Sequence, residues 1–314
     1  MTTTTLPLIP EAIDSKSIAE TRIKAKIRNK KWKRTLLALG LLAPSLIFMI
    51  AFTIYPILSS IKTSLYQDNL AVKEPVFKGV RNYTSLMSDP VFLESFWNNL
   101  LIAVVTIGAS VAIAVAMALF ATRVRYGRSF VRVSFFYPTV IPLVAAANLW
   151  MFIYTPIYGL IGQLNPDLRL LSDSKTAIWA LIAVLIWKQA GYLMVFYISG
   201  LNGISRDMFE AAKIDGAGSY RMFRYITWPL LKPTTIYVTI IALTNAYKMV
   251  DHLYIMTKGG PGNSTNMLLY YIYQTGFNFW NRGKASAMTV IMVGLLLLIT
   301  SVHFFLQDKK AYYN

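Results

Sequence analysis

Three charged residues lie inside segments that are otherwise apolar and long enough to cross a membrane: Lys188, Lys248 and Asp251. Lys188 is about twelve residues into its segment, close to the middle of a bilayer at about 1.5 Å per residue. A lysine there costs about 2.5–3.5 kcal/mol and is expected to face a cavity or a partner. Asp251 follows Lys248 by three residues, which on a continuous helix places both on one face.

The chemistry that such groups support is the binding of a polar solute. Aromatic faces and hydrogen-bonding side chains hold sugars and polyols, and several occur nearby: Asn148, Trp150, Gln189, Tyr192, Asn245 and Tyr247. Two lysines also suit a phosphorylated solute. Plainer roles stay open: a local ion pair for Lys248 and Asp251, and contact with a partner subunit or snorkelling to the interface for Lys188. Trp150 and Tyr154 would be membrane-interface anchors.

Covalent chemistry lacks its usual residues in this sequence. Cysteine is absent and the only histidines are His252 and His303, so no cysteine nucleophile and no histidine-rich metal centre is expected. No Gly-x-x-x-x-Gly-Lys-Ser/Thr loop for ATP occurs, and neither an arginine-repeat voltage sensor nor a Thr-Val-Gly-Tyr-Gly filter is present. We therefore predict a protein that is not an enzyme and that carries no cofactor or metal.

The loop over residues 200–233 has the most specific pattern. Ser205 is a candidate cap for a helix that carries Asp207 in its first turn and ends at Gly216 or Gly218. Ser219 is a candidate cap for a second helix that Pro229 is expected to end. The small Ala211 and Ala212 would let another surface approach closely. Four side chains would form exposed apolar knobs: Met208, Phe209, Met222 and Phe223. Such a compact element is suited to docking.

Composition and segment length predict the elements that must position these groups. Apolar residues make up 55% of the 314 residues and charged residues only 14%, against about 25% in soluble domains. A membrane-spanning helix needs about 20 apolar residues. Six segments meet this requirement, and Pro138 and Pro142 predict a kinked or broken start for the third. The predicted spans are 36–61, 100–121, 134–154, 177–199, 235–256 and 286–306.

The distribution of Lys and Arg predicts the orientation. Twenty of them fall on the side of the two termini and nine on the opposite side, so the positive-inside rule places both termini in the cytoplasm. The net charge of +17 includes a basic block over 22–34, which we interpret as a topology signal attracted to anionic lipid and not as a nucleic-acid arm. The expected divisions are a basic tail at 1–34, a transmembrane domain at 35–306 and a cytoplasmic tail at 307–314.

The 200–233 loop resembles a known motif. Glu210-Ala211-Ala212, followed by Asp215-Gly216-Ala217, Ile226 and Pro229, is similar to the EAA motif of the membrane subunits of binding-protein-dependent ABC importers. The extended pattern resembles the carbohydrate-uptake branch, which includes maltose-type and glycerol-3-phosphate-type permeases. Trp228 departs from the leucine that is common there. Further similar pieces are Tyr55-Pro56, Pro138 to Pro142, Trp187-Lys188 and Thr257 to Gly262, so the resemblance covers about residues 40–305.

The resemblance implies an all-α integral membrane protein with the type I ABC importer permease fold. It implies three kinds of partner: a second, homologous permease, a pair of ATPase subunits that hold ATP and Mg²⁺, and an extracytoplasmic solute-binding protein near the Gly259–Gly262 loop. The 200–233 loop would be the coupling helix that sits in a cleft of the ATPase. The residues carried over to coupling are Met208, Phe209, Glu210, Ala211, Ala212, Asp215 and Gly216.

The expected activity is ATP-driven import of a sugar or oligosaccharide by alternating access. Within the family, glycerol-3-phosphate or a glycerophosphodiester is the alternative substrate, because the surroundings of Trp187 to Gln189 and Ile214 to Gly218 suit that branch as well. From other classes, a secondary transporter or channel would need buried acidic relays or a filter, and a membrane-embedded enzyme would need a clustered His, Asp or Ser site.

Overall fold

The computed structural model describes residues 32, 34–35 and 37–308. The predicted tails at 1–34 and 307–314 fall almost entirely outside these residues. Only positions 32 and 34 of the first tail, and positions 307 and 308 of the second, are described. The chain divides into two units, Met1–Ser59 and Ser60–Asn314, and each is considered by itself.

The described residues are mostly helical. The elements after the first helical stretch are η1 (Ile50–Ile54), α2 (Tyr55–Ser64), β1 (Tyr66–Gln67), β2 (Val76–Phe77), α3 (Arg81–Met87), α4 (Pro90–Arg123), α5 (Arg128–Val140), α6 (Leu143–Tyr154), α7 (Leu160–Leu164), α8 (Ala177–Asn202), α9 (Arg206–Ile214), α10 (Ser219–Met222), η2 (Phe223–Thr227), α11 (Trp228–Leu230), α12 (Lys232–Lys248), α13 (Asp251–Met256), α14 (Leu268–Tyr273), η3 (Gln274–Asn278) and α15 (Arg282–Asp308). The two strands form a short antiparallel pair in which Tyr66 faces Phe77.

Four helices of the described chain are long and apolar enough to cross a membrane: Leu37–Ser64, Pro90–Arg123, Ala177–Asn202 and Arg282–Val302. Two further candidates are pairs of helices bent at a short break. The first joins α5 to α6 at 97°, and the second joins the segment Ser219–Leu230 to Lys232–Met256 at 66°. These six stretches correspond to the six predicted spans, and the predicted break in the third is confirmed at Ile141–Pro142.

The first unit is represented by the helix that begins at Leu37. Its π-helical turn η1 ends two residues before Pro56, and the backbone N–H of Tyr55 bonds the carbonyl of Ile50, five residues earlier. A proline in a regular helix removes a donor and collides with the carbonyl four residues before it. The wider π turn accommodates this, and the helix continues to Ser64.

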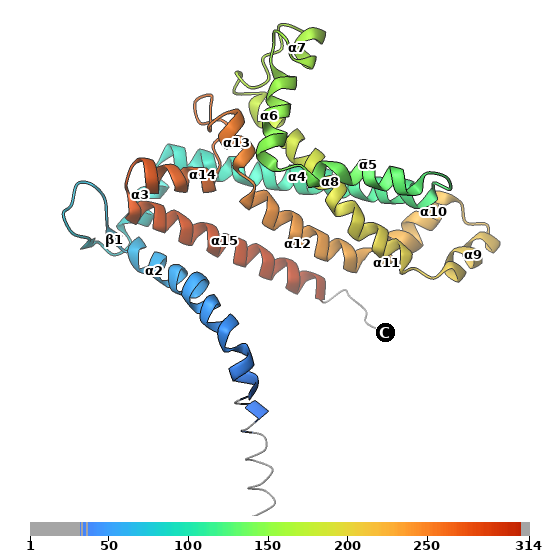
Figure 1. Cartoon of the computed structure of the whole chain (residues 1–314), viewed down its shortest axis with the longest axis horizontal. Helices are drawn as coiled ribbons and strands as arrows, with labels where there is room; N and C mark the ends of the chain where they lie inside the picture. The colour runs from blue at the N-terminus through green and yellow to red at the C-terminus, as the bar shows by residue number, and fades with distance from the viewer. Residues whose placement is uncertain (1–31, 33, 36, 309–314) are drawn as a thin grey trace, which may run out of the picture. The chain divides into compact units, whose positions relative to one another are not determined.

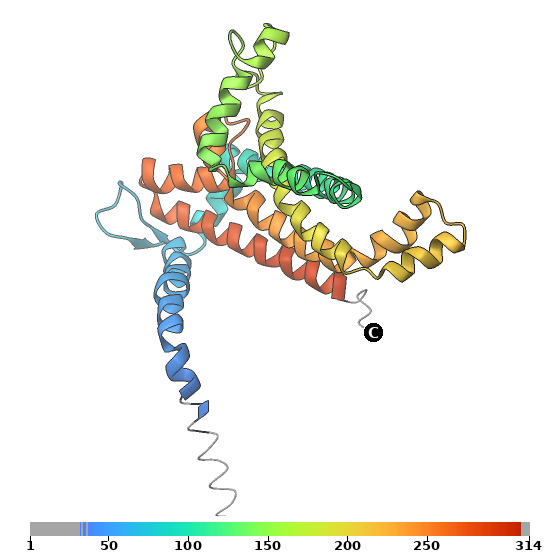
Figure 2. The ribbon, with the colours of Figure 1, turned by 45° about the vertical axis from the view of Figure 1, so that its right-hand side comes forward.

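The second unit packs its long helices side by side, with α4 against α8 as the most extensive pair. In Figures 1 and 2, α9 to α11 lie at one end of these helices, whereas α3, α14 and the strands lie at the other. The buried face of α4 carries small residues, among them Ala114, Ala118 and Ala121, which pack against Leu193 and Tyr197 of α8. Small side chains of this kind let helix backbones approach closely in a membrane.

α8 also crosses α5 at short range. Gly191 is buried at this crossing, and a Cβ atom there would collide with the backbone carbonyl of Phe135. Near its other end, a Cβ on Gly200 would lie 2.6 Å from Oγ1 of Thr234 and 2.9 Å from Cδ2 of Leu231. α8 is therefore fixed closely to the broken third span on one side and to the start of α12 on the other.

Candidate functional site

The first helix of the 200–233 loop forms as its sequence predicts. Ser205 is the cap of α9, and its Oγ accepts a hydrogen bond from the backbone N–H of Asp207 at 3.2 Å. Asp207 places negative charge in the first turn, where the helix dipole is positive. These local interactions stabilise a nine-residue helix that would be marginal in isolation.

Gly216 ends α9 in the left-handed conformation, with φ at 75°. The N–H of Ala217 bonds the carbonyl of Ala212 at 2.8 Å and the N–H of Gly216 bonds that of Lys213 at 3.0 Å, so the last carbonyls of α9 are satisfied. The predicted glycine turn is confirmed. A Cβ atom at Gly216 would meet nothing within 4 Å, so the constraint on this position is conformational.

The exposure of the predicted coupling residues is uneven. Glu210, Ala211, Asp215 and Gly216 are exposed, as docking would require, and Met208 is 45% exposed. Ala212 is buried within the chain itself, so it offers no surface for close approach. The expectation of exposed apolar knobs is wrong for Phe209, Met222 and Phe223, which are half-buried because they line a pocket between this loop and the ends of α4 and α8.

The second part of the loop differs from its prediction at both ends. Gly218, and not Ser219, occupies the cap position of α10. Pro229 does not end the helix, because the preceding turn η2 is π-helical and the N–H of Trp228 bonds the carbonyl of Phe223. As at Pro56, the wider turn admits the proline, so helical backbone continues to Leu230 before the chain bends into α12.

Lys188 is buried and its ammonium is held by backbone carbonyls. Nζ donates to the oxygens of Pro138 at 3.2 Å and Thr139 at 3.3 Å, and also to the oxygen of Ile141. The carbonyls of Pro138 and Thr139 belong to the last turn of α5, and that of Ile141 belongs to the residue after it, at the 97° bend. The lysine thus neutralises the negative end of the helix dipole and supplies donors that the broken helix lacks. Its three N–H groups match three acceptors.

Lys248 and Asp251 do not share a helix face, which corrects the prediction. α12 ends at Lys248 and α13 begins at Asp251, with the chain broken at Met249 and Val250. Both charged residues are exposed, and the only ion pair found among the described residues is elsewhere. The expected local pair is therefore not formed in this structure.

The structure does not bring the other candidates of the predicted substrate pathway together at one site. Tyr247 is buried in a hydrophobic cluster that also contains residues of α3, α4, α14 and α15, so it contributes to packing and does not line a passage. Asn148 is exposed and donates to the carbonyl of Val144 at 2.9 Å, while Asn245 and Tyr192 are half-buried. Gln189 is buried, with its amide nitrogen 3.9 Å from the sulfur of Met249.

One cavity was not predicted. It lies between α13 and α14, has a volume of about 600 Å³ and includes Asp251 in its lining. Three of its aromatic residues form a chain of ring contacts, with Tyr254 and Tyr270 at 6.0 Å and Tyr270 and Tyr273 at 6.3 Å. No spacing signal in the sequence identifies these rings, because Tyr254 belongs to α13 and Tyr270 and Tyr273 belong to α14, two helices that only tertiary packing brings together.

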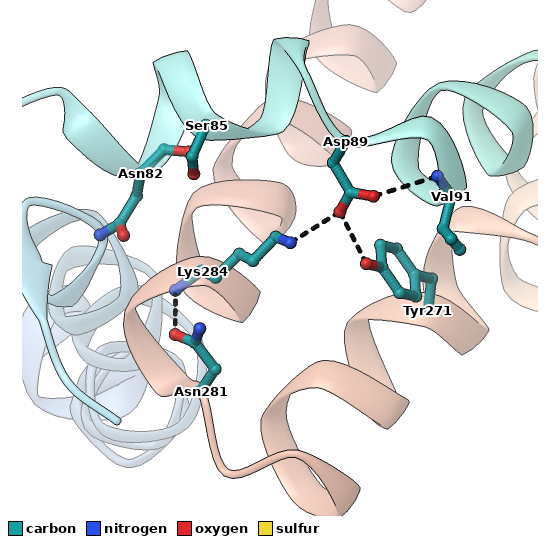
Figure 3. A network of polar contacts seen from close by, with 7 residues as sticks. All are labelled: Asn82, Ser85, Asp89, Val91, Tyr271, Asn281 and Lys284. Carbon is teal, nitrogen blue, oxygen red and sulfur yellow. Dashed lines mark hydrogen bonds and ion pairs between the residues drawn. The ribbon is translucent and has the colours of Figure 1, made fainter. Parts of the chain in front are cut away.

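A polar network joins α4, α14 and α15 through Asp89, Tyr271 and Lys284 (Figure 3). Asp89 caps α4, and its Oδ1 accepts from the N–H of Val91 at 3.0 Å. Its Oδ2 lies 2.6 Å from Nζ of Lys284 on α15 and accepts the hydroxyl of Tyr271 on α14 at 2.7 Å. Burial raises the pKa of Asp89, but the hydrogen bonds from Lys284 and Tyr271 outweigh it and hold the pKa below its usual 3.8.

Replacing Asp89 by asparagine is expected to lower the free energy of unfolding at pH 7 by about 1 kcal/mol, the upper end of the range for a partly exposed ion pair. Because the folded pKa is depressed, the stabilisation by Asp89 is present above pH 3.8 and is lost as the pH falls through the folded pKa. Thermal unfolding of both proteins in detergent at pH 7 and pH 3 tests this. The difference should shrink at pH 3; an undiminished difference would contradict the ionic origin.

The Gly259–Gly262 loop is held in place by several hydrogen bonds. Thr265 Oγ1 donates to the carbonyl of Gly260 at 2.8 Å, and Asn98 of α4 donates to the carbonyls of Asn263 and Asn266 at 3.3 and 3.2 Å. Gly259 has φ at 84°, a value that favours glycine. The loop is thus fastened to the start of α4.

Comparison with known proteins identifies the class. Residues 108–311 match the family "Binding-protein-dependent transport system inner membrane component". The chain is 32% identical over 276 residues to the "Probable starch degradation products transport system permease protein AmyD" of Thermoanaerobacterium thermosulfurigenes, covering 86% of this chain and 93% of the relative. It is 29% identical over 279 residues to the "sn-glycerol-3-phosphate transport system permease protein UgpA" of Brucella abortus biovar 1 (strain 9-941), covering 87% and 95%.

The fold is shared with a solved transporter. A chain from the "Crystal structure of bacterial alginate ABC transporter in complex with alginate pentasaccharide-bound periplasmic protein" superposes with a TM-score of 0.78 at 20% identity, covering 89% of this chain and 96% of that one. The matched relatives are membrane subunits of transporters and not enzymes. This chain therefore belongs to the family of binding-protein-dependent transport system inner membrane components, the permease subunits of ABC importers.

Proposed function

We propose that the chain crosses the cytoplasmic membrane six times with both termini in the cytoplasm, and that it forms half of a translocation pathway with a second, homologous permease. Four long apolar helices and two bent pairs support the six spans, and the asymmetry of Lys and Arg supports the orientation. The Gly259–Gly262 loop then lies outside, where a solute-binding protein would approach.

The 200–233 loop is proposed to couple the chain to a separate ATPase. The supporting observation is the exposed face of α9, where Glu210, Ala211 and Asp215 project from a helix that is capped at both ends. A short, rigid helix with a small residue on its outer face suits insertion into a cleft. ATP and Mg²⁺ would be held by the ATPase and not by this chain, and closure of the ATPase would move α9 as part of a rigid-body switch.

A neutral sugar or oligosaccharide is the substrate that the observations favour. The glycerol-3-phosphate alternative is supported by the relative from Brucella and would use a cation in the pathway. Lys188, the cation predicted near mid-membrane, already donates to three carbonyls. Lys248 is exposed and is the candidate that remains for a phosphate. Charge chemistry therefore favours the neutral solute.

The deciding experiment is purification of the tagged chain from its own host in a mild detergent. A second permease and an ATPase should copurify, and ATPase activity should rise when a sugar-loaded binding protein is added. Stimulation only with glycerol-3-phosphate would select the alternative substrate. Purification of the chain alone, with solute transport in liposomes without ATP, would replace the proposal with a secondary transporter or channel.

A further inference from the structure

A second pocket lies between the 200–233 loop and the turn that joins α4 to α5. It has a volume of about 530 Å³ and contains four cationic side chains, from three separate segments. Arg123 comes from the end of α4, Arg128 from the start of α5, and Arg206 and Lys213 from α9. No aspartate or glutamate lines it.

The cations of this pocket form no ion pair within the described chain. The only ion pair there joins Lys284 to Asp89, so no carboxylate contacts these four cations, although Asp207 and Glu210 are carried by the same helix as Arg206 and Lys213. Arg128 donates to the backbone carbonyl of Thr122 at 2.7 Å, which fixes its guanidinium but leaves its charge. Like charges brought to one site repel one another unless an anion accompanies them. The charge of the pocket is therefore complementary to an anionic ligand.

The donors suit a phosphate in particular. Arginine guanidinium groups bind phosphate oxygens through two parallel N–H bonds, and lysine adds a mobile charge. Hydroxyl and amide groups of Thr122, Asn202 and Ser219 line the same pocket. Its remaining wall is apolar and includes Phe209 and Phe223, which would contact the carbon part of a phosphoester.

Helix α9 carries the pocket-lining residues and Ala211 of the proposed docking surface on different faces, whereas Glu210 lies one turn from Arg206, beside the pocket. Arg206, Phe209 and Lys213 recur at helical spacing and line the pocket. Ala211 and Ile214 do not line it and are exposed, Ile214 at 88%. An anion in the pocket would join α9 to the ends of α4 and α5 without covering its outer face.

We propose that this pocket binds a phosphate-bearing anion, either a lipid headgroup or a soluble phosphate, and that the bound anion fastens α9 to the turn between α4 and α5. The same phosphate bridges Arg206 and Lys213 of α9 to Arg123 and Arg128 of the turn. The proposal concerns the chain by itself and does not rest on ATPase coupling or on the substrate.

The test uses the full chain in phosphate-free, uncharged detergent. One arm titrates inorganic phosphate, and the other compares phosphatidylglycerol with phosphatidylcholine in nanodiscs. Binding is measured by native mass spectrometry or calorimetry, and hydrogen exchange of residues 205–227 is followed in parallel. A response to phosphatidylglycerol alone identifies a lipid site, and a response to free phosphate identifies a soluble ligand.

The matched variants replace three cations by glutamine in each case. All six are exposed. Arg123, Arg206 and Lys213 line the pocket, whereas Arg221, Arg224 and Lys232 belong to the 200–233 loop and do not line it. The pocket variant should bind the anion at least about tenfold more weakly, and the anion should no longer slow hydrogen exchange in α9. The control variant should change affinity by less than about twofold. If the pocket variant is unstable, Arg206→Gln alone serves. Equal losses in both variants, or no binding by the unmodified chain, would overturn the proposal.

Discussion

Replacing Gly216 by valine is expected to reduce ATP-driven uptake at least about fivefold while leaving the protein in the membrane. Gly216 has φ at 75°, where a side chain costs about 1–2 kcal/mol, or roughly a factor of 5–30 in the population of the native turn. The cost is larger for a β-branched residue. The turn determines how α9 ends and where Asp215 points, so the exposed coupling surface would be lost. Uptake of labelled solute by cells, with membrane abundance by immunoblot, measures both quantities.

Gly218→Val is the matched control for this variant. Gly218 lies two residues away, is equally exposed, and a Cβ there also meets nothing within 4 Å, but its backbone is extended with φ at −71°. Valine adopts that conformation readily. Uptake by this control should stay near that of the unmodified protein. Normal uptake with valine at position 216 would remove the basis for coupling through this turn.

Replacing Lys188 by methionine is expected to destabilise the packing of α5 against α8. The carbonyls of Pro138, Thr139 and Ile141 would lose their shared donor, at about 1–3 kcal/mol for each group left unpaired in a buried site. The unfolded chain in the membrane would at the same time be relieved of a lysine that costs about 2.5–3.5 kcal/mol. Both effects lower the free energy of unfolding, so a large fall in the melting temperature in detergent should follow.

Two comparisons make the Lys188 result specific. Lys188→Arg keeps donors at the same depth and should retain more stability than the methionine variant. Lys175→Met removes an exposed lysine from the loop before α8 and should have little effect. If methionine at position 188 were as stable as the unmodified chain, the carbonyl contacts would not be what holds the bend.

Local signals allowed the sequence to predict α9 and its turn. A capping serine, an acidic first turn and a C-terminal glycine act within a few residues of one another, so their effects do not depend on distant packing. The break at Pro142 was predictable for the same reason. The partners of Lys188 were not, because they lie 47 to 50 residues away and become available only once α5 ends beside α8.

The features that the sequence did not predict depend on tertiary packing or on subtle backbone changes. The break between Lys248 and Asp251 contains neither glycine nor proline, so the pattern indicated one continuous helix. The burial of Phe209 depends on the approach of α4 and α8 to the loop. Pro229 was expected to stop a helix, but a π turn absorbs it.

The network around Asp89 has a consequence for how the chain is made. Tyr271 follows Asp89 by 182 residues, which at about 5–20 residues per second is roughly 10 to 40 s of synthesis. During that interval the carboxylate has no Tyr271 or Lys284, but its bond to the N–H of Val91 is available at once because it is local. The carboxylate of Asp89 thus has one hydrogen-bond donor, the N–H of Val91, as soon as α4 forms. The other two donors, Tyr271 and Lys284, are added only when α14 and α15 have been synthesised. A chain truncated before Lys284 therefore lacks the ion pair of Asp89.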